Sequence, residues 1–383
     1  MAGEGGKAPR TWLPALIGVR GYACVFVFLA HYYSLFSDSW LRSGSTVERF
    51  FGGLHGLADM GVELFFGLSG FLIYGPLVRR RRFALGKFFA RRFQRIYPVF
   101  LAVLAIYLVL SVVVPAASKL PDGFGPSMVY ILQNLAVMPG IFRIEPIITV
   151  SWTLSHEAAF YLAVPLLVLG LGLPRRRPTT RLAVSALVLA AVIGPLWPYV
   201  ARHRYCVMFL LGVMLADAED MMPNLFRRSW FQWIALVTVL LSAVALTTGR
   251  VWEYARFSPL LVGFPVTILL ACGAKHAAGP LTRAMSWKPA VHIGPVSYSF
   301  YMIHGLVLNG LKFGVIGGLG LKSESTWLFF LFCPFAFAMS LAAAAVLYRY
   351  VEEPFSITKA KPKARIQVQA EQRELEPVSA DVA

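Results

Sequence analysis

Long apolar segments separated by short polar loops are the feature that most constrains the fold of this chain of 383 residues. Crossing a bilayer takes about 20 apolar residues, and nine of the segments approach or exceed that length. The ten segments lie at about 14–36, 57–78, 96–114, 151–171, 182–199, 205–216, 229–248, 257–274, 292–313 and 326–349, of which 205–216 is the short one. Hydrophobic residues make up 57% of the chain and charged residues only 14%, which excludes a soluble domain. The sequence therefore predicts an all-α integral membrane protein with about ten transmembrane helices.

Basic residues cluster in the short loops, and their positions predict the orientation of the chain. The loop from Arg79 to Arg95 carries eight basic residues and no acid, and another basic loop lies at 175–181. Cytoplasmic loops are enriched in Lys and Arg, so both loops and both termini are predicted to be cytoplasmic. No full crossing then fits between 115 and 150, and the stretch 128–138 is predicted to be re-entrant or interfacial. The net charge of +17 thus reports topology, and no nucleic-acid partner is expected.

Composition divides the chain into three parts. Residues 1–13 are predicted to be a cytoplasmic N-terminal segment, residues 14–356 the transmembrane domain, and residues 357–383 a disordered cytoplasmic tail. The tail is rich in Glu, Gln, Lys, Ala and Pro and has little to bury. The four cysteines lie inside apolar runs without a CxxC spacing, so no metal site is predicted.

Two polar residues stand out in the first apolar segment. Arg20 and His31 are eleven residues apart, which places them on one helix face about 16 Å apart along the axis. An arginine inside a bilayer costs roughly 2.5 to 3.5 kcal/mol on insertion scales. Arg20 is therefore expected to face the protein interior or a water-filled space.

The predicted topology brings further polar residues to two depths. The outer half is expected to hold His31, Glu63, Glu157 and His304, and the inner side Arg20, Arg91, Arg92 and Arg95. A neutral histidine oriented by a carboxylate is the usual general base toward an alcohol, and arginines bind phosphates through bidentate contacts. This arrangement suits acyl transfer from a coenzyme A thioester, which is made in the cytosol, to a hydroxyl group.

Each of these residues also has a structural interpretation. His31 fits an interhelical hydrogen-bonding residue, and Arg20 fits a residue near the helix end that extends its charge to the interface. Glu63 and Glu157 fit ion-pairing partners that hold helices together. The basic loop from Arg79 to Arg95 is most simply a topology signal, although it would also meet phosphates or anionic lipid.

Several short motifs occur in order along the chain. They are Arg20 with His31; Gly61-Val62-Glu63-Leu64-Phe65-Phe66-Gly67-Leu68-Ser69-Gly70-Phe71-Leu72-Ile73; Arg91-Arg92-Phe93-Gln94-Arg95-Ile96-Tyr97-Pro98; Trp152-Thr153-Leu154-Ser155-His156-Glu157 with Phe160-Tyr161-Leu162; Phe209-Leu210-Leu211-Gly212; Ser297-Tyr298-Ser299 with Tyr301 and His304; and Glu353-Pro354-Phe355. Over residues 14–356 this series resembles the membrane-bound acyltransferase-3 family of O-acyltransferases.

The resemblance implies a fold, a reaction and its substrates. It implies ten or so helices around a central acyl-donor tunnel in the plasma or inner membrane. An acyl group, most often acetyl, would pass from acyl-coenzyme A to a hydroxyl of a surface polysaccharide, a lipid-linked glycan or a glycosylated natural product. Acyl-coenzyme A would be a co-substrate, with no permanently bound cofactor. Arg20 and His31 would be essential, and Glu157 is expected to be so.

Roles follow for the site residues. His31 is predicted to be the general base, with Glu157 orienting it or shaping the acceptor site. The predicted donor-binding residues are Arg20, Arg91, Arg92, Arg95 and Tyr97. The residues predicted to bind the acceptor or support the site are Glu63, Ser69, Trp152, Ser297, Tyr301 and His304. His55 and His156 are interpreted as exposed or rim residues.

Two alternatives stay open from the sequence. A multi-pass transporter or glycan flippase would use intramembrane Arg, His and Glu side chains as a proton or anion path. A scaffold that has lost its chemistry is disfavoured because Arg20, His31 and Glu157 are all present.

Overall fold

The computed structural model is helical and contains no strand over the residues that it describes, which are 14–58, 60–79, 84–200, 203, 205–226, 228–234, 237–238, 241, 280–322 and 324–355. Six helical stretches in this part of the chain are long and apolar enough to cross a membrane. They are α1 (Pro14–Trp40), Gly61–Val78 of α3 (Met60–Val78), α4 (Leu85–Val113), α6 (Ser151–Gly170), Lys288–Gly318 and Thr326–Phe355.

The last two stretches are composite. Lys288–Gly318 consists of α14 (Lys288–Ile293), η5 (Gly294–Val296), α15 (Ser297–Lys312) and η6 (Phe313–Gly318), and Thr326–Phe355 of α16 (Thr326–Leu347), η7 (Tyr348–Glu352) and α17 (Glu353–Phe355). The remaining helices are short or less apolar: α2 (Thr46–Ala58), η1 (Pro115–Ala117), α5 (Phe124–Leu135), η2 (Leu173–Arg175), α7 (Pro178–Ile193), α8 (Trp197–Val200), α9 (Cys206–Met221), α10 (Pro223–Phe226) and α13 (Pro280–Met285).

Six of the predicted spans correspond to these six stretches. The predicted span 182–199 is divided between α7 and α8, and 205–216 lies in α9. Most of 229–248 and all of 257–274 lie outside the described residues, as do residues 1–13 and the tail from 356 onward.

The predicted loop from Arg79 to Arg95 is wrong over its second half. Helix α4 begins at Leu85, eleven residues before the predicted span, and carries Lys87, Arg91 and Arg92. Lys, Arg, Gln and Ala are good helix formers, and the first proline after Leu85 is Pro98. The basic residues therefore extend a membrane helix at its end instead of interrupting it.

The stretch predicted to be re-entrant or interfacial forms most of α5. This helix has 12 residues, about 18 Å, which is too short for a hydrocarbon core of about 30 Å. The Asn134 side chain, which interrupted the apolar pattern, is buried and accepts a hydrogen bond from the backbone N–H of Ile147 at 2.9 Å. Asn134 thus fastens α5 to the loop that leads into α6.

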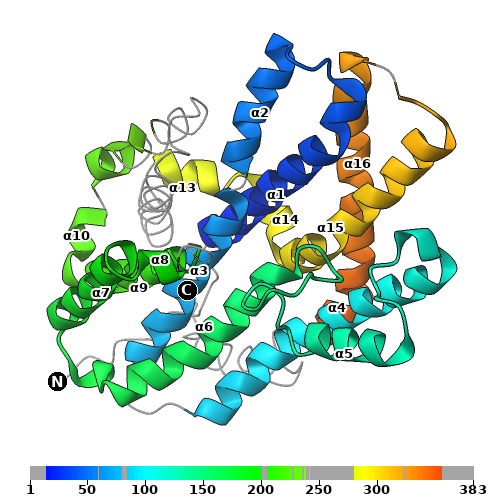
Figure 1. The fold of residues 1–383 in the computed structure, drawn as a ribbon. Helices are drawn as coiled ribbons and strands as arrows, with labels where there is room; N and C mark the ends of the chain where they lie inside the picture. Colours follow the sequence, from blue (N-terminus) through cyan, green and yellow to red (C-terminus); the bar gives the residue numbers. More distant parts are fainter. Residues whose placement is uncertain are drawn as a thin grey trace, which may run out of the picture.

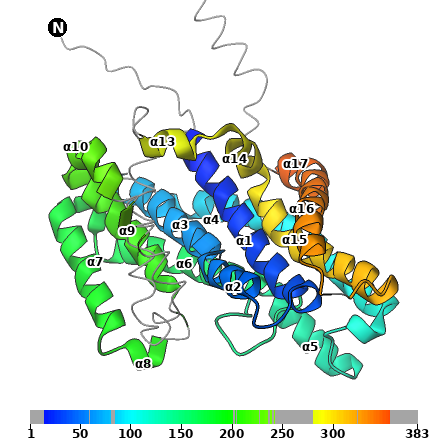
Figure 2. The same cartoon turned by 90° about the horizontal axis from the view of Figure 1, so that it is seen from above.

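Helix α1 runs through the middle of the bundle (Figures 1 and 2). It packs against α3 on one side and against α14, α15 and α16 on the other, while α9 packs against α3 and α7 against α9. Small residues allow the closest approaches: a Cβ on Gly212 of α9 would lie 2.2 Å from the carbonyl oxygen of Gly67 in α3.

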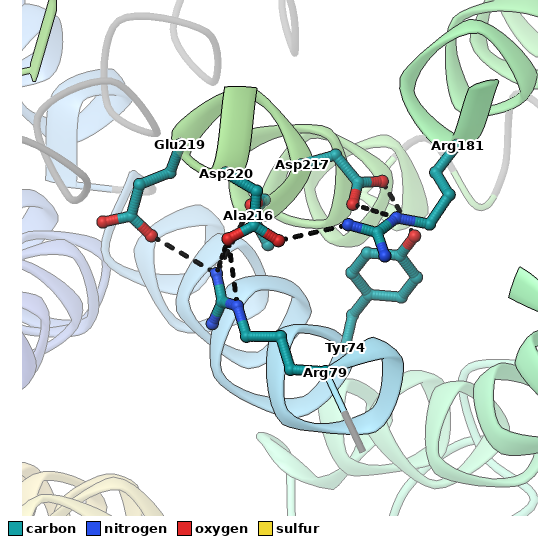
Figure 3. A network of polar contacts seen from close by, with 7 residues as sticks. All are labelled: Tyr74, Arg79, Arg181, Ala216, Asp217, Glu219 and Asp220. Carbon is teal, nitrogen blue, oxygen red and sulfur yellow. Dashed lines mark hydrogen bonds and ion pairs between the residues drawn. The ribbon is translucent and has the colours of Figure 1, made fainter. Parts of the chain in front are cut away.

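A buried charge network fastens α7 and α9 to α3 (Figure 3). Asp217 of α9 accepts hydrogen bonds from Arg181 of α7 at 2.7 Å and from the Tyr74 hydroxyl of α3 at 2.8 Å. Asp220 bridges Arg181 at 3.1 Å and Arg79, directly after α3, at 2.8 Å. Asp217 is fully buried and Arg181 is 5% exposed, so the pair is removed from water.

Candidate functional site

A cavity of about 810 Å³ lies between α1, α3, α4, α6 and α15. Its lining on α3 extends from Val62 to Leu77, fifteen residues or about 22 Å along the helix axis. We call the end at which α3 finishes and α4 starts the basic end. The opposite end, toward which His31 and His304 lie, is the histidine end.

Positive charge is concentrated at the basic end of the cavity. The cationic residues that line the cavity are Arg20, Lys87, Arg91, Arg92 and Arg95. The guanidinium carbon of Arg92 lies 5.3 Å from the ring centre of Phe88 and 5.2 Å from that of Tyr161. Stacking on aromatic faces leaves the edge of the guanidinium group available for an anion.

Three buried polar atoms around the cavity have no hydrogen-bond partner among the described residues. They are Nε of Arg20, Nε of Arg92 and Oγ of Ser297, which is fully buried. Leaving a buried polar atom unpaired typically costs about 1–3 kcal/mol. A polar or anionic ligand in the cavity would relieve this cost.

Glu157 contributes the carboxylate of the cavity. It accepts hydrogen bonds from Ser69 at 3.1 Å and from the Tyr161 hydroxyl, and it interacts electrostatically with Arg92 and Arg95. The structure therefore brings Glu157 together with the predicted donor-binding arginines. Its predicted role toward His31 stays a prediction.

A second carboxylate, that of Glu352, was missed from the sequence. Its Oε2 accepts hydrogen bonds from the backbone N–H of Ser299 at 3.2 Å and from the Ser299 hydroxyl at 2.5 Å. It also interacts electrostatically with Arg20 and Arg95.

The two predicted imidazoles meet. The ring centres of His31 and His304 are 5.0 Å apart in an edge-to-face arrangement. Nδ1 of His31 lies 2.9 Å from the carbonyl oxygen of Val27, and Nδ1 of fully buried His304 lies 2.8 Å from that of Tyr301. A carbonyl oxygen only accepts, so Nδ1 carries the hydrogen in both rings and Nε2 is the basic nitrogen of the neutral form.

Some predicted site residues lie away from the cavity wall. Ser69, Ser297 and Tyr301 line it, as do the four predicted arginines and Glu157, whereas His31, Glu63, Tyr97, Trp152 and His304 are not among its lining residues. The Tyr97 ring stacks on Phe93 of its own helix, with ring centres 4.2 Å apart.

His156 is buried, in contrast to its predicted rim position. It is 3% exposed, and Nδ1 lies 2.9 Å from the carbonyl oxygen of Trp152. Nε2 lies 3.1 Å from Nδ1 of His203. The His156 ring lies near the Phe66 ring of α3, with ring centres 6.2 Å apart. Neighbouring protein therefore covers the face of α6 that carries His156.

The comparisons with known proteins identify a family. The profile of the acyltransferase-3 family, described as an acyltransferase domain, matches residues 13–349. Acyltransferase MdmB of Streptomyces mycarofaciens is 28% identical over 378 residues, which cover 89% of this chain and 91% of MdmB. No solved structure matches the chain significantly.

Two further relatives are O-acetyltransferases by name. Peptidoglycan O-acetyltransferase OatA of Listeria monocytogenes is 24% identical over 324 residues, covering 77% of this chain and 49% of OatA. O-acetyltransferase OatA of Staphylococcus aureus is 24% identical over 339 residues, covering 78% and 50%. The match thus spans about half the length of each OatA protein. Since the family profile covers most of the chain, this protein belongs to the acyltransferase-3 family of multi-pass membrane O-acyltransferases.

Proposed function

We propose that this enzyme transfers an acyl group, in the first instance acetyl, from acyl-coenzyme A to a hydroxyl of a carbohydrate or glycosylated acceptor. The observation that carries the proposal is the cavity, which combines five cationic side chains with an apolar wall. The phosphates of coenzyme A suit the arginines at the basic end, and its long arm suits the apolar lining toward the histidine end.

His31 is the general base of the proposed transfer step. Nε2 of His31 takes the proton of the acceptor hydroxyl while the hydroxyl oxygen attacks the thioester carbonyl carbon. The new C–O bond forms, the C–S bond breaks, and the thiolate of coenzyme A leaves and takes up the proton from the His31 imidazolium. General-base catalysis of this kind typically contributes about 10²- to 10⁴-fold.

The orientation proposed for the bundle follows from the donor. Coenzyme A thioesters are made in the cytosol, so the basic end faces the cytoplasm, in agreement with the positive-inside rule. Both termini are then cytoplasmic, and about ten helices surround a central donor tunnel. The carbohydrate class of acceptor is supported by the peptidoglycan named for the Listeria relative.

Donor binding by Arg92 tests this proposal. We expect purified protein in nanodiscs to bind acetyl-coenzyme A and to release coenzyme A slowly from it. Arg92→Ala removes a charged hydrogen-bonding partner of the phosphates, worth about 1.5–3 kcal/mol, so the Kd for the donor should rise about 10- to 150-fold.

The matched control is Arg175→Ala, since Arg175 is an exposed arginine of the second basic loop that does not line the cavity. The Kd of this variant for acetyl-coenzyme A should stay within about twofold of the native value. That is well below a tenfold change, which corresponds to about 1.4 kcal/mol. Absence of donor binding by the native protein, or equal losses in both variants, would overturn the proposal.

A further inference from the structure

The cavity stops about one helical turn short of the histidine pair. Tyr301 lines the cavity, and His304 follows three residues later on α15, about 4.5 Å further along the axis. The ring centres of Tyr301 and His304 are 5.9 Å apart. On the side of α15, a layer of side chains at the level of Tyr301 therefore lies between the cavity and His304.

Three residues from three helices form this layer. The hydroxyl groups of Tyr301 and Thr153 are 2.8 Å apart, and the Thr153 hydroxyl also donates to the carbonyl oxygen of Val150 at 2.9 Å. The ring of Phe65 from α3 meets the Tyr301 ring edge-on, with centres 5.9 Å apart. Phe65, Thr153 and Tyr301 line the cavity near its histidine end, where the lining on α3 reaches Val62, three residues before Phe65. We call these three residues the end wall.

We propose that the end wall limits the length of the acyl group that the enzyme accepts. The inference rests on the proposed function, because it takes the cavity to hold acyl-coenzyme A with its phosphates at the basic end. The acyl tip of the donor then rests against Phe65 and Tyr301. The thioester carbonyl faces α1, the side that the end-wall residues of α3, α6 and α15 leave open, and there the acceptor hydroxyl and Nε2 of His31 reach it.

The wall is firm enough to discriminate. Thr153 is 5% exposed, and its hydrogen bonds fix Tyr301 against α6, so the wall cannot yield by a simple rotation of one ring. One extra methylene in a filled apolar site changes specificity by about 10- to 200-fold. An acetyl group is expected to fit, and each added methylene to be penalised until the chain no longer enters.

Donor binding tests this without knowledge of the acceptor. The Kd values of coenzyme A, acetyl-, butyryl- and hexanoyl-coenzyme A are measured on the full chain in nanodiscs. In the native protein, Kd should rise from acetyl to butyryl by at least about tenfold. Phe65→Ala and Tyr301→Ala should reduce this ratio to about threefold or less. The ratio is taken within each variant, so that any change in the Kd of coenzyme A itself is measured separately.

Tyr298→Ala is the matched control. Tyr298 lines the same cavity from the same helix, about one turn nearer the basic end, where its hydroxyl donates to the carbonyl oxygen of Ile96 at 2.9 Å. The same loss of volume there lies beside the donor arm and not beyond the thioester, so the native chain-length ratio should persist. Thr153→Val, which removes only the hydroxyl, covers the case in which the alanine variants do not fold, and it should lower the ratio.

The outcomes separate the two claims. If the native protein binds no coenzyme A species, the proposed function is wrong and this inference falls with it. If coenzyme A and acetyl-coenzyme A bind but chain length has no effect, or Tyr298→Ala changes the ratio as much as Phe65→Ala, the inference alone is overturned.

Discussion

Arg92 illustrates how single residues prepare the cavity for an anion. Its guanidinium group lies against the Phe88 and Tyr161 rings, and the Tyr161 hydroxyl donates to Glu157. The guanidinium group also makes a side-chain hydrogen bond with Tyr161, whereas its buried Nε has no partner among the described residues. Tyr161 therefore has two separable roles, one through its ring and one through its hydroxyl.

Two substitutions of Tyr161 separate these roles. Tyr161→Phe keeps the ring under Arg92 and should change the Kd for acetyl-coenzyme A less than about threefold. Tyr161→Leu removes a cation–π contact worth about 0.5–2 kcal/mol, so Kd should rise about 2- to 30-fold. Isothermal titration on both variants measures the difference, and a larger effect of Tyr161→Phe would show that the hydroxyl matters more than the ring.

Arg20 and His31 were recognisable from the sequence because charged and titratable groups are costly inside an apolar helix. Thr153 and Tyr298 stand within the motifs but were given no role, since a hydroxyl in a membrane helix is common and its partner lies on another helix. Glu352 escaped for a related reason: its hydrogen bonds to Ser299 depend on how η7 packs against α15.

At the scale of elements, the contact between α3 and α9 depends on the absence of side chains. A Cβ on Gly212 would lie 2.2 Å from a carbonyl oxygen of α3, whereas a Cβ on Gly310 of α15 would meet nothing within 4 Å. Gly212→Ala should therefore push the helices apart and destabilise the protein by about 1–3 kcal/mol. Gly310→Ala should be neutral or stabilising by up to about 1 kcal/mol. Thermal unfolding of the two variants compares them directly, and equal melting temperatures would contradict the close contact.

The buried pair Arg181–Asp217 is the polar counterpart of this contact. Arg181→Met leaves Asp217 with its charge buried and only Tyr74 as a partner, which should cost about 3–5 kcal/mol. Adding Asp217→Asn removes the charge while an oxygen still accepts from Tyr74, so part of the loss should be recovered.

The control for this pair is Arg349→Met, because the Arg349 side chain is 67% exposed and that of its partner Glu353, four residues later in the chain, is 27% exposed. An exposed ion pair of this kind should contribute little to stability. Tryptophan fluorescence during thermal unfolding follows all three variants. A loss of stability for Arg349→Met as large as that for Arg181→Met would contradict the assignment of the buried pair as the stronger interaction.

The length of the apolar segments was enough to predict that the helices exist, but not to predict where they begin and end. Helix α4 extends to Leu85 because its basic residues are good helix formers, so charge marks the end of the apolar run and not the end of the helix. The pattern at 182–199 has the length of a span, yet the helix stops at Ile193, before Gly194 and Pro195. Gly194 is a poor helix former, and Pro195 removes a backbone donor, so the helix ends there although the residues around them are apolar. Gly75-Pro76 does not have this effect, because α3 continues through it to Val78.

At the scale of the whole molecule, the proposed donor-binding residues and the proposed general base lie at two different heights along the bundle. The cavity with its arginines forms one level, and the histidine pair beyond the end wall forms the other. The sequence predicted an arginine level and a histidine level, but it placed Glu157 with the histidines, whereas Glu157 lines the cavity together with the arginines. It did not predict the wall between the two levels, because that wall exists only where α3, α6 and α15 meet.

The most direct test of separate sites for donor binding and for general-base catalysis is to measure both donor binding and turnover in His31→Ala. His31 does not line the cavity, so the variant should bind acetyl-coenzyme A with a Kd within about threefold of the native value. Release of coenzyme A should fall by about 10²- to 10⁴-fold, because the general base is absent. His292→Ala, an exposed histidine of α14, should leave both quantities unchanged. Unchanged turnover in His31→Ala, or loss of donor binding in that variant, would contradict the account.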